Sequence, residues 1–281
     1  MDFHGKGGLR LIADAWGDPG AAPVLLLHGG GQTRYAWGGT ARALARAGWY
    51  AISLDLRGHG ESDWDPDGDY SAEAFVEDFL GVSSGLARRP AVVGASLGGI
   101  TALLAEGESA GGICSALVLV DIVPKMEPEG VERIVGFMRA APDGFASVQE
   151  AADAIASYLP HRARPRDLSG LRKNLRRHDD GRYRWHWDPR FLSGHNRLSA
   201  ARDPDRLRTA ARALRVPTLL VRGRMSELVS EDGAREFIEL VPHARYVDVS
   251  RAGHMVAGDR NDVFSEAVID FLEGFRESGS A

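Results

Sequence analysis

Short apolar runs recur along this chain at intervals that few folds can accommodate. They cover residues 24–27, 50–54, 91–93, 116–120 and 218–221. Mostly unbroken runs of this length are typical of parallel strands that are buried on both faces. Helical patterns lie between them, over residues 40–47, 72–86 and 98–106. Alternating strands and helices form βαβ units with right-handed crossovers, so the pattern predicts an α/β fold with a mostly parallel central sheet flanked by helices.

The predicted sheet has two further strands and a large insertion. Residues 9–16 suit an antiparallel edge strand, and residues 246–249 suit a last parallel strand before a closing helix over 262–275. Between residues 124 and 214 the alternation stops. This region has helical patterns and no convincing strand; the helical segments are 131–139, 148–158 and 168–178. We therefore predict a core of residues 1–123 and 215–281, with a helical lid over 124–214.

Composition excludes several classes of protein. The chain has 281 residues, with 34 Lys and Arg against 39 Asp and Glu, which is an ordinary globular balance. Cys114 is the only cysteine, so no intrachain disulfide and no multi-cysteine zinc site can form. The N-terminus lacks the apolar stretch of a signal peptide, and no run is long enough to span a bilayer. We expect a cytoplasmic monomer or homodimer that binds a small molecule, with no nucleic acid, membrane or metal partner.

The motif that carries the clearest chemistry is Gly94-Ala95-Ser96-Leu97-Gly98. It follows a predicted strand and precedes a predicted helix, which is the context of a nucleophile elbow. Small residues at both ends allow a sharp turn that projects the Ser96 hydroxyl above the sheet. Because a serine hydroxyl needs a base to take its proton, a histidine must lie nearby. His254 is the candidate, since it follows the last strand at the same edge of the sheet.

On these motifs the chain resembles lid-bearing serine hydrolases of the α/β-hydrolase fold. The resemblance rests on four motifs in the family's order and spans residues 24–275. The motifs are His28-Gly29-Gly30-Gly31, Asp55-Leu56-Arg57-Gly58-His59-Gly60-Glu61-Ser62, the segment Gly94 to Gly98, and Gly253-His254. Such a set is specific for a fold but only weakly specific for a substrate.

The resemblance also assigns roles to two loops. It implies that the oxyanion hole is formed by the backbone N–H groups of Gly30 and Leu97, with Gly31 as the nearest competitor of Gly30. It implies that the segment from Asp55 to Ser62 is structural, with Asp55 and Arg57 bracing the turn and no catalytic role for His59.

The acid that orients His254 departs from the family's commonest pattern. The usual form after the strand at 218–221 is Gly-x-x-Asp, but here Gly223 is followed by Arg224, Met225, Ser226 and Glu227. We predict Glu227, because its longer side chain could recover the reach. Asp121, at the end of the strand at 116–120, is the alternative, and some family members supply the acid from that position. Asp248 is predicted to be structural.

Lid residues are candidates for substrate contacts. Met126, Phe137, Trp185 and Trp187, together with Gly31, are predicted to line the pocket, although core packing is an alternative for the apolar ones. From residue 161 to residue 184 there are eight arginines and one lysine against three aspartates. These cations suit a solvated face, or a gate for an acidic substrate.

The predicted function is cofactor-independent hydrolysis of a carboxylic ester, thioester or lactone through an acyl-enzyme. Ser96 would attack the carbonyl carbon, and His254 would transfer the proton. Two alternatives stay open, a cofactor-free perhydrolase or haloperoxidase-like enzyme and a noncatalytic ligand receptor on the same fold. No metal is predicted, because ligand spacings such as H-E-x-x-H do not occur.

Overall fold

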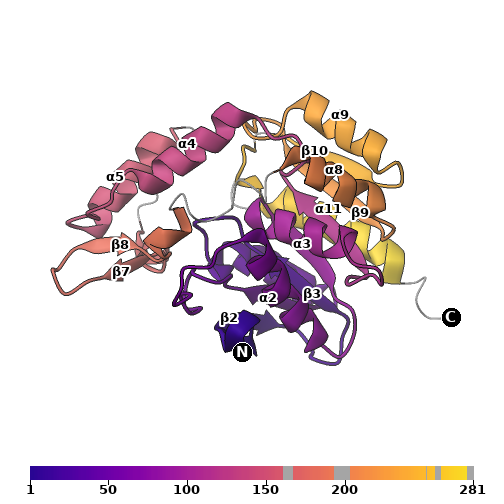
Figure 1. Cartoon of the computed structure of the whole chain (residues 1–281), viewed down its shortest axis with the longest axis horizontal. Helices are drawn as coiled ribbons and strands as arrows, with labels where there is room; N and C mark the ends of the chain where they lie inside the picture. Colours follow the sequence, from indigo (N-terminus) through magenta and orange to yellow (C-terminus); the bar gives the residue numbers. More distant parts are fainter. Residues whose placement is uncertain (161–166, 193–202, 251, 257–260, 277–281) are drawn as a thin grey trace.

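The computed structural model describes residues 1–160, 167–192, 203–250, 252–256 and 261–276. Its centre is an eight-stranded sheet with the order β1-β2-β4-β3-β5-β6-β9-β10. The two N-terminal strands pair antiparallel and the other strands pair parallel. The strands are β1 (Asp2–His4), β2 (Arg10–Trp16), β3 (Pro23–Leu27), β4 (Tyr50–Leu54), β5 (Ala91–Ala95), β6 (Ala116–Val120), β9 (Thr218–Gly223) and β10 (Arg245–Val249). The predicted mostly parallel sheet is therefore present (Figure 1). The strand predicted at residues 9–16 is β2 and pairs antiparallel, but it is not the edge strand, because β1 pairs with its outer side.

Helices cover both faces of this sheet. They are α1 (Gly38–Arg46), α2 (Ala72–Ser84), α3 (Leu97–Gly107), α8 (Pro204–Ala213), α9 (Glu231–Leu240) and α11 (Asn261–Arg276), with a short 3-10 turn, η2 (Arg34–Trp37), before α1. Serine side chains mark where two of them begin: Ser71 and Ser230 each accept a hydrogen bond from a backbone N–H of the first turn. Within the described ranges, no helix combines the length and apolar character that a membrane crossing requires.

The lid region forms a separate group of elements on one side of the core (Figure 1). It contains α4 (Pro128–Arg139), α5 (Val148–Tyr158), α6 (Ser169–Arg172), β7 (Leu175–Arg177), β8 (Tyr183–Trp185) and the 3-10 turn η3 (Pro189–Leu192). The stretch predicted as lid also includes α8, which packs on the core helix α3. Backbone atoms of Ala210 lie so close to Gly107 that a Cβ there would be 2.3 Å from the Ala210 oxygen.

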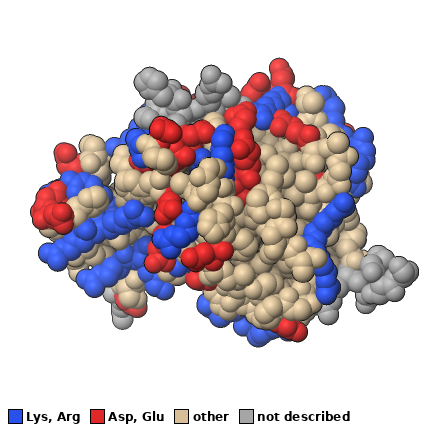
Figure 2. Space-filling view, turned by 60° about the horizontal axis from the view of Figure 1, so that its bottom comes forward, with Lys and Arg blue, Asp and Glu red and all other residues tan. Residues whose placement is uncertain are grey.

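The prediction of a lid without strands is wrong. Strands β7 and β8 pair antiparallel, and the predicted helix over 168–178 is only the single turn α6. The physical reason is the turn between these two strands. It contains Asp180-Gly181, a pair that favours hairpins, and it is closed by a hydrogen bond from the His178 N–H to the Arg182 carbonyl. Lys and Arg side chains gather at this end of the molecule (Figure 2). Residues 161–166, which supply part of the predicted basic stretch, lie outside the described residues.

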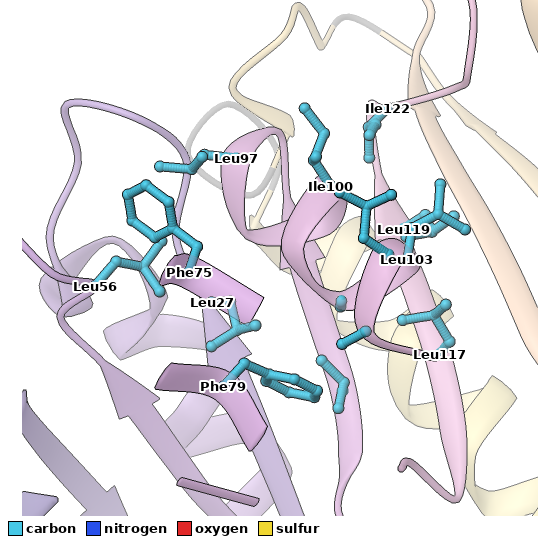
Figure 3. Packing of buried hydrophobic residues seen from close by; sticks show 14 of the residues in the cluster. Leu27, Leu56, Phe75, Phe79, Leu97, Ile100, Leu103, Leu117, Leu119 and Ile122 are labelled. Atoms are coloured by element: carbon cyan, nitrogen blue, oxygen red, sulfur yellow. The ribbon is translucent and has the colours of Figure 1, made fainter. Parts of the chain in front are cut away.

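Alternate residues of each core strand face opposite sides of the sheet, as strand geometry requires. Leu25 and Leu27 of β3 join an apolar cluster with α2, α3, α8 and α9, whereas Val24 and Leu26 pack with α1 and α11. Figure 3 shows part of the first cluster, in which the phenylalanines of α2 lie near Leu27 of β3 and Leu103 of α3 lies near Leu119 of β6. Because both faces are covered, the strands read as unbroken apolar runs, and the loops at their carboxyl ends are left to carry the chemistry.

Candidate active site

Ser96 lies in the turn between β5 and α3, where its backbone has φ 45° and ψ −112°. A positive φ is disfavoured for a residue with a Cβ atom, so the turn stores strain. Close packing enforces it, because a Cβ on Gly98 would lie 2.5 Å from the Leu27 carbonyl oxygen. The strand–turn–helix context expected for Ser96 is therefore present.

A second strained residue lies on the neighbouring strand. In the described part of the chain, the only residues other than glycine with positive φ are Ser96 and Asp121, and Asp121 has φ 51°. Asp121 directly follows β6, which pairs with β5 on one side and with β9 on the other. Its backbone N–H donates to the Val221 carbonyl of β9 over 2.7 Å. Both strained residues therefore stand at the carboxyl edge of adjacent strands.

Asp121 contacts His254. The Oδ2 atom of Asp121 lies 2.7 Å from Nδ1 of His254 and also accepts a hydrogen bond from the Ser226 hydroxyl over 2.5 Å. The Oδ1 atom accepts the N–H of Gly223 over 3.1 Å. The carboxylate is fully buried, while His254 is partly exposed. A buried carboxylate with these donors favours a fixed imidazole orientation and stabilises a positive charge on the ring.

The predicted contact between Glu227 and His254 is wrong. Glu227 is exposed and forms an ion pair with Arg133 of α4. After β9 the chain turns, with the Ser226 N–H donating to the Gly223 carbonyl over 2.8 Å, and the following residue faces the lid. Extra side-chain length therefore does not restore the reach. Ser226, which occupies the usual place of the acid, instead donates its hydroxyl proton to the alternative candidate, Asp121.

The backbone N–H groups predicted for the oxyanion hole differ in their availability. Among the described residues, the N–H groups of Gly30 and Leu97 have no hydrogen-bond acceptor in the protein. The N–H of Gly31 donates to Nε2 of His59 over 3.1 Å. The N–H of Gly31 therefore has a protein acceptor, whereas the N–H of Gly30 has none among the described residues.

A cavity of about 780 Å³ lies between the core and the lid. Ser96, Leu97 and His254 line it, together with Gly30. All five residues predicted to contact substrate also line this cavity: Gly31, Met126, Phe137, Trp185 and Trp187.

Stacked aromatic rings form part of the cavity wall. Phe137 stacks on Tyr158 with ring centroids 4.2 Å apart, and Trp185 stacks on Trp187 with centroids 5.1 Å apart. Pockets of this kind, mostly apolar with a few polar groups, suit small organic ligands.

The segment from Asp55 to Ser62 has the structural contacts expected of it. The buried Arg57 guanidinium donates to both oxygens of Asp78 on α2, over 2.6 and 2.7 Å. Asp55 accepts the backbone N–H of Arg34 over 2.6 Å and that of Glu61 over 2.9 Å. These bonds brace the turn. Asp248, which was predicted to be structural, forms an ion pair with Arg222 over 3.0 Å.

Two residues at the site were not singled out as functional candidates in the sequence. Ser226 donates a hydrogen bond to Asp121. The only indication of this in the sequence is that Ser226 occupies the position where the family usually has an aspartate. His186 of the lid contacts the glycine-rich loop after β3 through the Gly31 carbonyl. It lies between the two tryptophans that were predicted to line the pocket. Among the described residues, no group of three or more His, Cys, Asp or Glu side chains has an arrangement that could bind a metal ion.

Comparisons with known proteins identify the family of this fold. The family model of the alpha/beta hydrolase fold matches residues 22–260. An esterase of Mycobacterium tuberculosis is 33% identical over 276 residues, which cover 94% of this chain and 86% of the relative. A mouse sn-1-specific diacylglycerol lipase is 29% identical over 267 residues, covering 91% of this chain and 82% of the lipase.

Solved structures give the same result. A crystal structure of the M. tuberculosis esterase has a TM-score of 0.73 at 32% identity, over 94% of this chain and 89% of the other. The structure of E-2-(acetamidomethylene)succinate hydrolase has a TM-score of 0.83 at 24% identity, over 97% and 99% of the two chains, which shows a shared fold alone. With the family model covering most of its length and the parallel sheet carrying Ser96, His254 and Asp121 at one edge, this chain belongs to the α/β-hydrolase fold family.

Proposed function

We propose that this protein is a serine esterase in which Ser96, His254 and Asp121 form the catalytic triad. The observation that carries the proposal is the 2.7 Å contact between Asp121 and His254 at a cavity that Ser96 also lines. The relatives named as an esterase and a lipase support hydrolysis of an ester-type bond.

The chemistry follows from the positions of these groups. Ser96 Oγ attacks the ester carbonyl carbon while His254 takes the hydroxyl proton, and the charge that develops on the imidazole is stabilised by Asp121. The negative charge on the carbonyl oxygen is stabilised by the N–H groups of Gly30 and Leu97, each worth about 3 kcal/mol in the transition state. His254 then protonates the leaving alcohol, and water hydrolyses the acyl-enzyme by the same steps.

The cavity indicates the kind of substrate. Its aromatic and aliphatic lining suits an ester with a sizeable apolar group, rather than an acetyl ester alone. Esters, thioesters and lactones share the acyl-enzyme step, so a panel of these three classes over several acyl lengths would identify the preferred bond.

The first test is Ser96→Ala. Alanine fits the same backbone, so the variant should fold with a normal thermal midpoint but lose several powers of ten in kcat. A fluorophosphonate should label the wild-type protein at Ser96 and leave the variant unlabelled. Retention of more than a few per cent of esterase activity in the variant would reject Ser96 as the nucleophile. A wild-type protein that binds members of the panel without turning them over would instead support a receptor.

A further inference from the structure

Three consecutive peptide groups of the oxyanion loop are each bonded to a different buried histidine. His28 Nδ1 lies 2.8 Å from the Gly29 carbonyl oxygen, in the peptide that carries the Gly30 N–H. The next peptide donates its Gly31 N–H to His59 Nε2 over 3.1 Å. In the third peptide, the Gly31 carbonyl oxygen lies 3.2 Å from His186 Nε2. We call residues 29–32 the oxyanion loop.

The second nitrogen of each ring also has a backbone partner, which sets the protonation of the ring. His28 Nε2 accepts the Leu56 N–H over 3.0 Å, His59 Nδ1 lies 2.9 Å from the Arg57 carbonyl oxygen, and His186 Nδ1 accepts the Gly60 N–H over 2.7 Å. Every ring therefore faces one acceptor and one donor, an arrangement that a neutral imidazole satisfies and an imidazolium does not. The proton lies on Nδ1 in His28 and His59, and on Nε2 in His186.

Burial also favours the neutral form of the three imidazole rings. The three rings are almost entirely inaccessible to solvent, and their centroids lie 5.2 Å apart for His28 and His59 and 5.8 Å apart for His59 and His186. Desolvation lowers the pKa of His28 to about 4 and that of His59 to about 3, and it lowers the pKa of His186 well below its ordinary value. The rings are therefore neutral at physiological pH and act as hydrogen-bond partners rather than as charges.

The loop needs such partners because it has little side-chain packing of its own. Three successive glycines can adopt many backbone conformations, and Gly31 has φ 76°, in the left-handed region. The direction of the Gly30 N–H depends on the Gly29 carbonyl, since both belong to one planar peptide. That carbonyl also accepts the Gln32 N–H over 3.0 Å. The Gln32 N–H in turn belongs to the peptide whose carbonyl contacts His186.

His186 differs from the other two histidines because it comes from the lid. It follows β8, whereas His28 and His59 belong to loops of the core. Its bonds to the Gly31 carbonyl and the Gly60 N–H thus connect the lid directly to the oxyanion loop and to the segment from Asp55 to Ser62.

We propose that His186 is a positioning residue that aligns the Gly30 N–H for the oxyanion, so that the oxyanion hole is complete only when the lid is docked. The proposal rests on the proposed esterase function and assigns to that site a component from the lid. His186 touches no reacting atom; it acts through the peptide of Gly31 and Gln32.

Two substitutions separate the two bonds of His186. A glutamine amide nitrogen occupies about the position of Nε2, so His186→Gln can still donate to the Gly31 carbonyl while it loses the bond to Gly60. An asparagine oxygen occupies about the position of Nδ1, so His186→Asn can keep Gly60 and loses Gly31. We expect kcat to fall about 10- to 30-fold in His186→Asn, less than the loss of a whole oxyanion donor. KM should change less than threefold, and His186→Gln should keep at least a third of the wild-type kcat.

The control is Tyr70→Phe. The Tyr70 hydroxyl donates to Asp188 of the lid over 2.7 Å, so this variant removes one bond between lid and core but leaves the lid docked through both bonds of His186. Each kcat is expressed per site titrated with a fluorophosphonate, and thermal midpoints are measured in parallel. Tyr70→Phe should lower the midpoint and leave kcat per site within about twofold of the wild type.

An inhibitor separates positioning from stability. A trifluoromethyl ketone forms a tetrahedral oxyanion on the serine, whereas the matching methyl ketone binds mainly as a ground state. In His186→Asn the affinity for the first should fall in parallel with kcat, and the affinity for the second should be unchanged. Equal kcat losses in the Asn and Gln variants, no loss in either, or unchanged trifluoromethyl ketone affinity would overturn the proposal. Activity in Ser96→Ala would reject the esterase mechanism instead.

A measurement on the wild-type protein covers the case in which His186→Asn does not fold. Long-range ¹⁵N–¹H NMR spectra at pH 7 should show neutral rings, with the proton on Nε2 in His186 and on Nδ1 in His28 and His59. A proton on Nδ1 of His186 would remove the bond to the Gly31 carbonyl and would overturn the proposal without any assay of turnover.

Discussion

The core and the lid meet at one cavity, but they are built differently. The core has two large apolar clusters, one on each face of a sheet whose strands are mostly buried. The far part of the lid has a small cluster of its own, in which the buried residues are Phe145, Val148, Ala151 and Leu175. The difference teaches that the core can be stable by its own packing, whereas the lid depends on its attachment to the core.

The attachment of the lid combines apolar and polar contacts. Trp187 and Phe191 insert into a core cluster, and Phe191 packs edge-on against Phe75 with centroids 6.2 Å apart. Polar bonds lie around them: Asn174 accepts the Thr33 hydroxyl over 3.1 Å, and the Arg176 guanidinium donates to the Gly60 carbonyl. The core thus supplies the proposed reacting groups, and the lid supplies part of the wall of the cavity and a bond to the oxyanion loop.

The largest expected effect compares two carboxylates, one at the end of a core strand and one facing the lid. Asp121→Asn should lower kcat by a factor on the order of 10⁴, because the imidazole loses its orienting acceptor and its counter-charge. Glu227→Gln removes an exposed ion pair and should change kcat less than about twofold, with less than about 1 kcal/mol in unfolding free energy. Steady-state kinetics and urea denaturation measure both. A large loss in Glu227→Gln with a mild Asp121→Asn would reverse the assignment of the acid.

The second expected effect concerns acid stability and divides the three histidines between core and lid. In the unfolded chain these rings protonate near pH 6.5, whereas in the folded chain burial keeps the pKa of His28 at about 4 and that of His59 at about 3. The unfolded state therefore binds more protons as the pH falls below 6.5, and the free energy of unfolding decreases toward pH 4. His28 and His59 each contribute up to about 1.4 kcal/mol per pH unit in this interval.

His186→Gln removes the lid's share of this effect. Urea denaturation at several pH values between 7 and 5 should give a shallower pH dependence for the variant, with a difference that grows toward one proton as the pH falls to 5, because the pKa of His186 is also lowered by burial. Identical slopes for the wild type and the variant would show that His186 is not held neutral against the oxyanion loop. They would contradict the proposed bond between the lid and that loop.

The smallest expected effect lies in the lid wall. Phe137→Ala removes a ring that stacks on Tyr158 and lines the cavity. We expect kcat/KM for the longest acyl esters to fall about tenfold, since part of a buried apolar contact is lost, while acetyl esters change less than twofold. Kinetics over a series of acyl lengths measure this. Equal losses for short and long esters would show that the lid does not form the acyl pocket.

Local pattern was enough to predict the core sheet and to place Ser96 and His254, two members of the proposed triad, at one edge of it. Unbroken apolar runs identify strands covered on both faces, and the Gly94-to-Gly98 motif requires a sharp turn wherever it follows a strand and starts a helix. His254 could be placed because it follows the last strand, at the edge where Ser96 stands. These features depend on residues within one or two turns of chain, so they can be recognised without knowledge of long-range contacts.

The identity of the carboxylate that contacts His254 and the structure of the lid depend on the tertiary structure. Asp121 and His254 are 133 residues apart in the chain, and their contact depends on β6 lying between β5 and β9 and on the positive φ of Asp121. The turn that follows β9, closed by the bond from the Ser226 N–H to the Gly223 carbonyl, directs Glu227 toward Arg133 and away from His254. In the lid, the hairpin and the bond from His186 to the oxyanion loop depend on packing against the core. The sequence alone therefore determined the sheet and the places of Ser96 and His254 at its edge. Pairing between distant segments determined which carboxylate contacts His254 and where the lid contacts the core, because short-range patterns carry no information on which side chains meet across the fold.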